Sequence, residues 1–205
     1  MKRDAYALAR FLTVALFACA AALANAHSDG EAAGGFWSGY LHPLSGLDHL
    51  LAMVAVGIWG ATLGRPLIWA LPIAFPLMMV VGGILGIARV PLPFVEIGVA
   101  LSVIVLGLSI ALAWRAPVPV AVAIVAVFAI FHGHAHGTEL PVTGQPAAYA
   151  VGFVISTGLL HLAGIAIGSL KSLRYGAQLL RVAGAAIAVT GVWIFMGLMG
   201  VSYVA

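Results

Sequence analysis

The sequence predicts an all-α, polytopic membrane protein with six transmembrane helices after a cleaved signal peptide. Of its 205 residues, 63% are hydrophobic and only 7% are charged, and the mean hydropathy is +1.15. Six apolar segments, each of about 20 residues or more, run roughly over 44–63, 67–87, 94–114, 117–136, 147–169 and 178–203. They are too many and too long for one soluble core of this size, so we expect each to cross a lipid bilayer.

The N-terminal residues 1–26 have the pattern of a secretory signal peptide. Its positive start consists of three basic residues, Lys2, Arg3 and Arg10. An apolar stretch follows at 11–23, and the small-x-small residues 24–26 form a cleavage site. The alternatives are an uncleaved first span, for which about 13 apolar residues are short, and lipoprotein processing at Cys19. We expect cleavage after Ala26.

Cleavage there has consequences for the mature chain, residues 27–205, which we expect to form one six-helix domain. The only cysteine is removed, so neither thiolate ligation nor a disulfide is available. His27 becomes the first residue, and its amine and imidazole together can chelate a metal with Asp29 nearby; the alternative is a disordered polar tail. The formal net charge of +3 falls once the basic start is lost, and no basic patch for nucleic acid remains.

Basic residues are distributed unevenly over the expected loops. If the signal peptide delivers the mature N-terminus to the outside, the loops after the first, third and fifth segments face the cytoplasm. These loops and their edges hold Arg65, Arg115, Lys171, Arg174 and Arg181, whereas the outer loops hold Arg89. This asymmetry follows the positive-inside rule. We therefore expect a multi-pass protein whose mature N-terminus is periplasmic.

Glycines recur at the small-xxx-small spacing that lets helix backbones approach closely. The pairs are Gly60/Gly64, Gly82/Gly86, Gly133/Gly137 and Gly164/Gly168. They predict a tightly packed bundle. They indicate no particular dimer and leave homo-oligomerisation open.

A first polar cluster, His42, Asp48 and His49, lies at the outer start of the first segment. Ionisable groups in apolar sequence are costly without partners, and imidazole with carboxylate binds divalent metals. In one continuous helix, His42 and His49 are seven residues apart and share a face, with Asp48 about 100° away. The alternative is that Asp48 complements the dipole at a helix N-terminus, which explains the acid but not the two histidines beside it. We expect a metal site.

The second polar cluster ends the fourth segment, which also exits outside. His132, His136 and Glu139 follow i, i+4, i+7 spacing and lie in one stripe of a helix. Histidines at i and i+4 can hold a single metal. His134 points to roughly the opposite side and either supports the ligands or lines a vestibule. Gly133 and Gly137 either admit a neighbouring backbone or let the helix end unwind.

Two further residues are candidates with open alternatives. Glu96 begins the third segment near the outer face and is either a ligand or proton acceptor, or an interfacial charge near Arg89. His161 lies well inside the fifth segment and is either a ligand or relay further along a pathway, or a histidine hydrogen-bonded within the bundle.

The chemistry of the candidate donors limits the ion. Nitrogen and oxygen donors suit Ni²⁺, Co²⁺, Zn²⁺ or Cu²⁺ better than Cu⁺, Mg²⁺ or Ca²⁺. We expect no prosthetic group, and a divalent metal that is carried rather than kept. The methionines are expected to serve packing.

At these residues the chain resembles the HupE/UreJ family of bacterial nickel/cobalt permeases. The family pattern of His, five residues and Asp-His is matched from His42 to His49, and Phe-His-Gly-x-Ala-His-Gly-x-Glu is matched from Phe131 to Glu139. The resemblance covers essentially the whole chain and implies a cleaved signal peptide, six mature helices, and nickel uptake for hydrogenase or urease maturation. It implies that five residues are critical for transport, His42, Asp48, His49, His136 and Glu139, and it matches two further positions to Phe75 and Glu96.

We therefore expect a secondary transporter, not an enzyme, that imports a divalent transition-metal ion across the bacterial inner membrane. Nickel or cobalt is the expected ion. No P-loop is present, so this chain does not hydrolyse ATP. The alternative is an intramembrane zinc hydrolase with Glu139 or Glu96 as general base.

Overall fold

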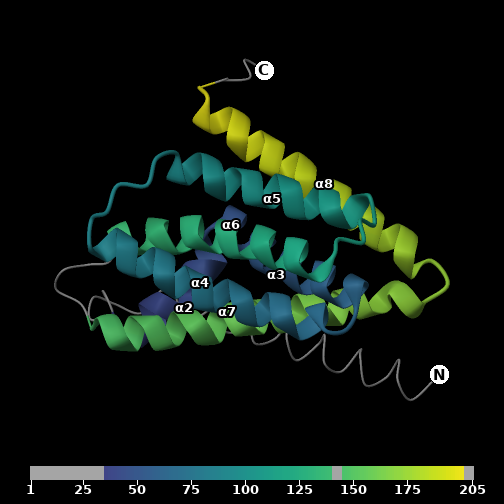
Figure 1. Cartoon of the computed structure of the whole chain (residues 1–205), viewed down its shortest axis with the longest axis horizontal. Helices are drawn as coiled ribbons and strands as arrows, with labels where there is room; N and C mark the ends of the chain where they lie inside the picture. Colours follow the sequence, from purple (N-terminus) through teal and green to yellow (C-terminus); the bar gives the residue numbers. More distant parts are fainter. Residues whose placement is uncertain (1–34, 140–144, 201–205) are drawn as a thin grey trace.

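The computed structural model describes residues 35–139 and 145–200, and within these ranges the chain is helical without any strand (Figure 1). The elements are α2 (Phe36–Ser45), α3 (Leu47–Leu63), α4 (Leu67–Ile87), α5 (Val95–Ala111), α6 (Val118–Glu139), α7 (Pro146–Gly168), the 3-10 helix η1 (Ser169–Ser172) and α8 (Gly176–Leu198). Each of the six predicted apolar segments overlaps one of the longer helices. The predicted all-α class is confirmed for the described part of the chain.

Length and hydropathy make four of these helices candidates for membrane spans: α4, α6, α7 continued into η1, and α8. A fifth candidate is the pair α2 and α3, which pass the same test together but are bent by 83°. α5 is apolar and has 17 residues. The predicted signal peptide, residues 1–26, and the candidate ligand His27 lie outside the described residues.

The bend between α2 and α3 corrects the expectation of one continuous helix from His42 to His49. Gly46 is extended, with φ −93° and ψ 119°. Pro43, inside α2, lacks an N–H, and the Ser45 hydroxyl donates to the His42 carbonyl oxygen at 2.7 Å, which satisfies one acceptor at the helix end. His42 and His49 therefore belong to different helices and do not share a helix face.

The helices pack through glycines, which confirms the predicted close approach for three of the four pairs, Gly82/Gly86, Gly133/Gly137 and Gly164/Gly168, whereas a Cβ at Gly64 would meet nothing within 4 Å. A Cβ atom at Gly133 of α6 would collide with the backbone of Met79 in α4, and one at Gly137 would collide with the backbone of Gly83. Gly133 faces Met79 and Gly137 faces Gly83, so residue numbers increase in the same direction along both helices. α4 and α6 therefore run parallel. The helix end at Gly137 therefore does not unwind; it admits a neighbouring backbone.

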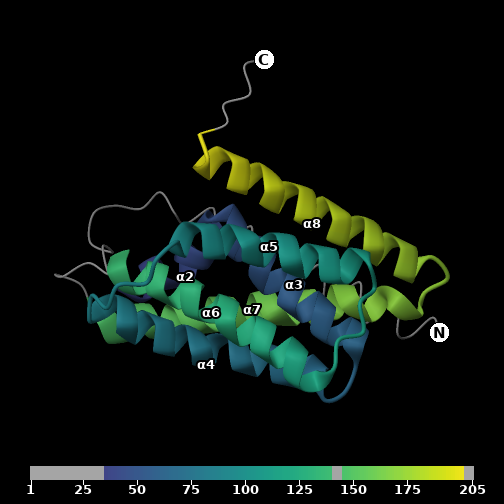
Figure 2. The same cartoon turned by 45° about the horizontal axis from the view of Figure 1, so that its top comes forward.

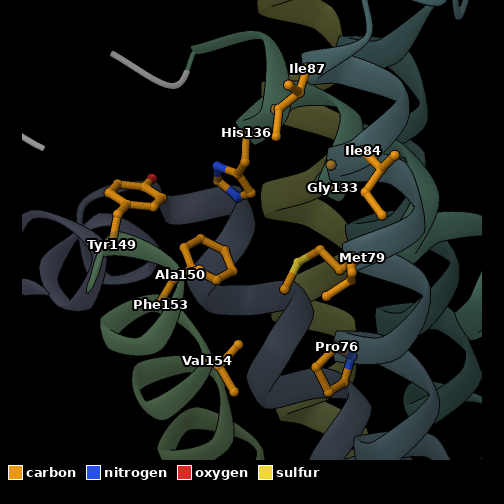
Figure 3. Close-up of a pocket in the computed structure, with 13 residues that line it drawn as sticks. Pro76, Met79, Ile84, Ile87, Gly133, His136, Tyr149, Ala150, Phe153 and Val154 are labelled. Atoms are coloured by element: carbon orange, nitrogen blue, oxygen red, sulfur yellow. The ribbon is translucent and has the colours of Figure 1, made fainter. Parts of the chain in front are cut away.

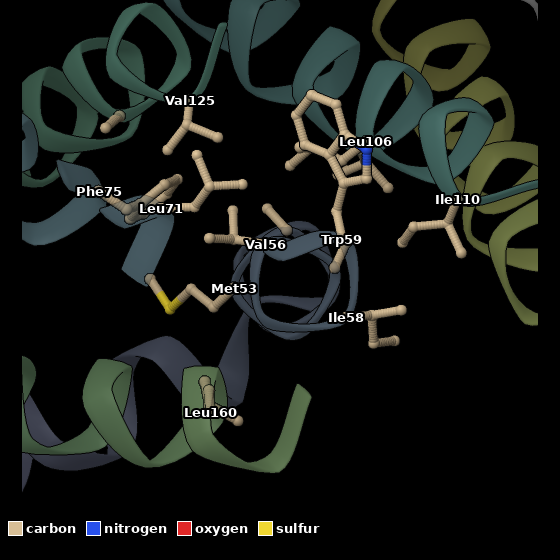
Figure 4. Packing of buried hydrophobic residues seen from close by; sticks show 14 of the residues in the cluster. Met53, Val56, Ile58, Trp59, Leu71, Phe75, Leu106, Ile110, Val125 and Leu160 are labelled. Atoms are coloured by element: carbon tan, nitrogen blue, oxygen red, sulfur yellow. The ribbon is translucent and has the colours of Figure 1, made fainter. Parts of the chain in front are cut away.

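α3 lies at the centre of the bundle, where α4, α5 and α7 surround it (Figures 1 and 2). Figure 4 shows Met53, Val56 and Trp59 pointing from α3 toward different neighbouring helices, and all three side chains are fully buried. The indole N–H of Trp59 donates to the Trp114 carbonyl oxygen at 3.2 Å. This packing holds the first turn of α3, with its polar side chains, in the middle of one end of the bundle.

Candidate metal centre

Three helix ends bring the predicted polar residues together at one end of the bundle. α2 contributes His42 from its last turn, α3 contributes Asp48 and His49 from its first turn, and α6 contributes three residues from its last two turns, His132, His136 and Glu139. The two sequence clusters, which are far apart along the chain, form one site.

The outermost group consists of His42, His136 and Glu139. Each offers one ligand atom, and these three atoms lie within 4.8 Å of one another. His42 Nε2 is 3.8 Å from Glu139 Oε2, and the two side chains are 33% and 61% exposed. Metal–ligand bonds of about 2.0–2.2 Å place two donors on opposite sides of one ion about 4 Å apart. A small contraction would therefore let these three side chains hold one ion that arrives from outside the bundle.

The Asp48 carboxylate determines how His49 presents its ring. Asp48 Oδ1 accepts from the backbone N–H of His49 at 2.8 Å and lies 2.8 Å from His49 Nδ1. A carboxylate has no proton to give, so Nδ1 carries the hydrogen and Nε2 has the free lone pair. His49 Nε2 is buried and has no hydrogen-bond partner among the described residues. This is the carboxylate–histidine arrangement that orients a metal-binding imidazole.

Ser102 of α5 orients His132 in the same way. The Ser102 hydroxyl donates its single proton to the Val99 carbonyl oxygen at 2.6 Å. At 2.8 Å it must therefore accept from His132 Nε2–H. The other nitrogen, Nδ1, retains its lone pair, is buried, and has no partner among the described residues. Sequence reasoning missed Ser102, a polar residue in an apolar helix whose partner lies 30 positions away.

His136 connects the two levels of the site. Its ring centroid is 4.7 Å from that of His42 and 4.4 Å from that of His49, and His49 is 4.7 Å from His132. His136 is 7% exposed, and neither of its ring nitrogens has a hydrogen-bond partner in the described part of the chain. Buried polar atoms without partners are costly and rare. Several such nitrogens gathered in one cluster are what a cation site requires.

Phe75 of α4 closes the inner side of the cluster. Its ring is fully buried, and its centroid lies 5.5 Å from that of His132 and 5.5 Å from that of His161. His161 forms a hydrogen bond with the Pro72 backbone. The Pro72 carbonyl is available because Pro76, four residues later, has no N–H to offer it. The ring of Phe75 thus connects His161 to the other histidines.

A cavity of about 180 Å³ lies beside His136, between α4, α6 and α7. Figure 3 shows the His136 ring between the aromatic side chains of α7 and the aliphatic side chains of α4. Phe153 lies 4.5 Å from His136, and Tyr149 lies 5.9 Å from His42, both measured between ring centroids. Sequence reasoning missed these two aromatic residues, since nothing distinguishes them from ordinary packing residues of an apolar helix. Their rings pack against His42 and His136 on the side of α7.

The remaining predicted residues lie elsewhere. Glu96 is exposed in the first turn of α5 and has no hydrogen bond or ion pair with any described residue. His134 is 2.8 Å from the Val90 carbonyl oxygen, to which its Nε2–H donates, and so ties α6 to the segment after α4. It supports the helix end rather than facing the other histidines.

Comparison with known proteins gives an independent result. The family model described as "HupE / UreJ protein" matches residues 14–194. The chain is 45% identical to "Protein HupE" of Rhizobium leguminosarum bv. viciae over 175 residues, which cover 85% of this chain and 91% of that protein. No solved structure matches the chain. By the extent of both sequence matches, the chain belongs to the HupE/UreJ family.

Proposed function

We propose that this protein is a secondary transporter that imports a divalent transition-metal ion, nickel or cobalt, across the bacterial inner membrane. The observation that carries the proposal is the convergence of four imidazoles and two carboxylates at one end of an apolar bundle. In that cluster the free nitrogens of His49, His132 and His136 are buried without partners. A protein that only needed a stable bundle would lose stability by burying them.

Six membrane crossings account for the helix directions. α4 and α6 run parallel, so the chain must return between them, and α5 connects the two. At 1.5 Å per residue, 17 residues span about 26 Å, close to the hydrocarbon thickness of about 30 Å. The four long helices, the bent pair α2 and α3, and α5 together give six crossings of the membrane. The metal centre would then lie on the periplasmic side. The proposed signal peptide delivers the mature N-terminus to that side.

The charge distribution supports this orientation. The acidic residues of the described chain are Asp48, Glu96 and Glu139, and all lie at the helix ends on the side of the metal centre. The opposite end holds five basic residues, Arg65, Arg115, Lys171, Arg174 and Arg181. The positive-inside rule places this basic end in the cytoplasm.

The geometry supports a stepwise route. Glu139 and His42, the exposed members, would attract a hydrated cation and replace part of its water. His136 would then pass the ion to His49 and His132, whose neighbours hold the lone pairs toward the cluster. Each transfer is short because consecutive rings are less than 5 Å apart by their centroids.

Phe75 would be the barrier between this outer site and His161. An aromatic ring gives no ligand for a divalent ion, so the ion cannot remain there and must pass when the ring moves. His161 and the Pro72 carbonyl would receive it on the inner side. An inside-negative potential contributes about 2.3 kcal/mol per charge per 100 mV, or about 4.6 kcal/mol for a divalent ion.

Imidazole nitrogens with carboxylate oxygens suit nickel, cobalt, zinc and copper(II), and disfavour magnesium and calcium, which prefer oxygen alone. Within this set, the resemblance to the nickel/cobalt permeases leads us to propose nickel or cobalt. The imported ion would then serve the maturation of a hydrogenase or urease, so this protein would be linked to that enzyme only indirectly, through the ion.

The test is flux in liposomes that contain the purified protein. An inside-negative potassium diffusion potential is imposed, and the uptake of Ni²⁺, Co²⁺, Zn²⁺, Cu²⁺ and Mg²⁺ is measured one at a time. We expect saturable uptake of Ni²⁺ or Co²⁺ that increases with the potential, and no uptake of Mg²⁺. No flux of any ion, together with a retained metal and turnover of a lipid or peptide, would instead support the zinc hydrolase.

A further inference from the structure

A second cavity, of about 260 Å³, lies at the end of the bundle opposite the metal centre. Segments from four elements surround it: the ends of α3 and α5, η1, and the first turns of α8. Its lining includes three basic side chains, Arg115, Lys171 and Arg181, and no acidic one. The cavity therefore concentrates positive charge with no carboxylate to balance it.

Two of these cations are held in place by helix ends. Lys171 Nζ donates to the carbonyl oxygens of Ala61 at 2.6 Å and Thr62 at 3.1 Å, near the end of α3. Arg181 Nε donates to the Ala111 carbonyl oxygen at 2.8 Å, at the end of α5. These contacts stabilise the negative ends of two helix dipoles. They also fix both cations at the rim of one cavity.

The bonds to the helix ends leave donors unused. An ammonium has three N–H donors and a guanidinium has five. Lys171 therefore retains one donor, and Arg181 retains the four on its terminal nitrogens. Arg115 forms no side-chain hydrogen bond or ion pair with the described residues. Guanidinium groups bind phosphate oxygens through paired N–H donors, and an ammonium serves as a point charge.

The surroundings of the cavity match a phospholipid rather than a free anion. Neighbouring residues at the C-terminal end of α5 and on α8 expose large aliphatic side chains: Leu112, which follows α5, is 69% exposed, and Leu179 and Val182 of α8 are 63% and 68% exposed. Trp114 lines the cavity, and aromatic residues of this kind are enriched at membrane–water interfaces. A phospholipid would place its phosphate among the cations and its acyl chains along the aliphatic side chains.

We propose that this cavity binds the phosphate of an anionic phospholipid headgroup. Basic pockets between transmembrane helices on the cytoplasmic side are sites of this type. The bound phosphate would join α3, α5, η1 and α8 through one anion. This matters most for α8, which packs chiefly on α5 and lies at the outside of the bundle (Figure 2). The lipid would thus hold α8 against the rest of the molecule, whichever ion is transported.

The test uses the full chain, purified in a neutral detergent and delipidated. Phosphatidylglycerol and phosphatidylcholine are added separately, and bound lipid is counted by native mass spectrometry while thermal unfolding is followed in parallel. We expect one phosphatidylglycerol to bind per chain and to raise the unfolding temperature. Phosphatidylcholine, inorganic phosphate and glycerol 3-phosphate should do neither at the same concentrations.

Variants locate the site. Arg115→Gln and Arg181→Gln should each weaken phosphatidylglycerol binding by about tenfold, the loss of one charge-assisted contact. Arg65→Gln and Arg174→Gln are the matched controls, since these arginines lie at the same end but outside the cavity lining, and they should bind as the parent does. Arg181 also binds α5, so Arg115→Gln is the decisive variant if Arg181→Gln does not fold.

Three outcomes would overturn the proposal. They are equal binding of phosphatidylcholine and phosphatidylglycerol, unchanged binding in Arg115→Gln, and saturation by inorganic phosphate with no preference for the lipid. The last outcome would leave an anion site but remove the lipid. None of these readouts involves metal transport, so the proposed lipid site and the proposed transport function fail independently.

Discussion

The carboxylate of Asp48 holds the adjacent residue His49 at two points, with Oδ1 2.8 Å from both the backbone nitrogen and the ring Nδ1. The backbone contact fixes the start of α3, and the ring contact leaves the lone pair on the buried Nε2. In the proposed transporter, Asp48 would therefore act on the ion through His49, as a positioning residue.

This relationship predicts different results for two substitutions of Asp48. Asp48→Asn keeps an oxygen that can accept both bonds but removes the charge, whereas Asp48→Ala removes both. We expect metal affinity to fall by about 10- to 100-fold in Asp48→Ala, as for other residues that orient a ligand, and less in Asp48→Asn. Titration calorimetry with Ni²⁺ on the purified parent and both variants measures the three affinities and so ranks them. Equal affinity in all three proteins would remove Asp48 from the site.

Ser102 offers a test of a residue that no sequence pattern marks. Ser102→Ala leaves His132 Nε2–H without its acceptor and lets the ring turn, so we expect affinity for the ion to fall by about tenfold. Ser109→Ala is the matched control, because Ser109 lies on the same helix and donates only to the Val105 carbonyl oxygen. The role assigned to Ser102 is contradicted if both alanine variants bind Ni²⁺ alike.

In the proposed route His161 comes after Phe75, so a substitution at His161 tests translocation separately from binding. His161→Ala leaves the outer cluster intact, so equilibrium Ni²⁺ binding should stay close to that of the parent. Flux into liposomes should decrease strongly, because the ion has no acceptor beyond the aromatic barrier. Circular dichroism controls for folding. Parental flux in His161→Ala would show that the route does not include this histidine.

The contact between α4 and α6 makes the site sensitive to one added methyl group. In Gly133→Ala the new Cβ would collide with the Met79 backbone and push α4 away from α6, the helix that carries both His132 and His136. We expect a lower unfolding temperature and a loss of uptake. Gly158→Ala is the control: its Cβ meets nothing within 4 Å, and alanine is favoured over glycine in a helix by about 0.5–1 kcal/mol. Equal stability of the two variants would contradict this packing.

Local patterns predicted the helices well. The second apolar segment coincides with α4, Leu67–Ile87, since hydropathy and flanking breakers both act within the segment itself. The same holds for His132, His136 and Glu139, whose common face follows from helix period alone.

The bend at Gly46 escaped prediction. Pro43 is compatible with the first turn of a helix, and a lone glycine inside an apolar run is compatible with a continuing helix. The bend places α2 against α7, where a Cβ at Gly39 would collide with Tyr149, and no local pattern indicates that contact. Ser102 and Phe153 escaped for a related reason: their roles depend on partners from other helices, and helix period carries no information on that pairing.

Whether the joined histidine clusters carry the ion is tested by flux into liposomes, measured for the parent, His136→Ala and Thr138→Ala at one imposed inside-negative potential. His136 connects the outer and inner levels, whereas Thr138 lies two residues away on the exposed side and donates only to the Ala135 carbonyl oxygen. We predict that His136→Ala abolishes Ni²⁺ or Co²⁺ flux, while Thr138→Ala transports as the parent does. Parental flux in a folded, membrane-inserted His136→Ala would contradict the proposal that the ion passes through the histidine clusters.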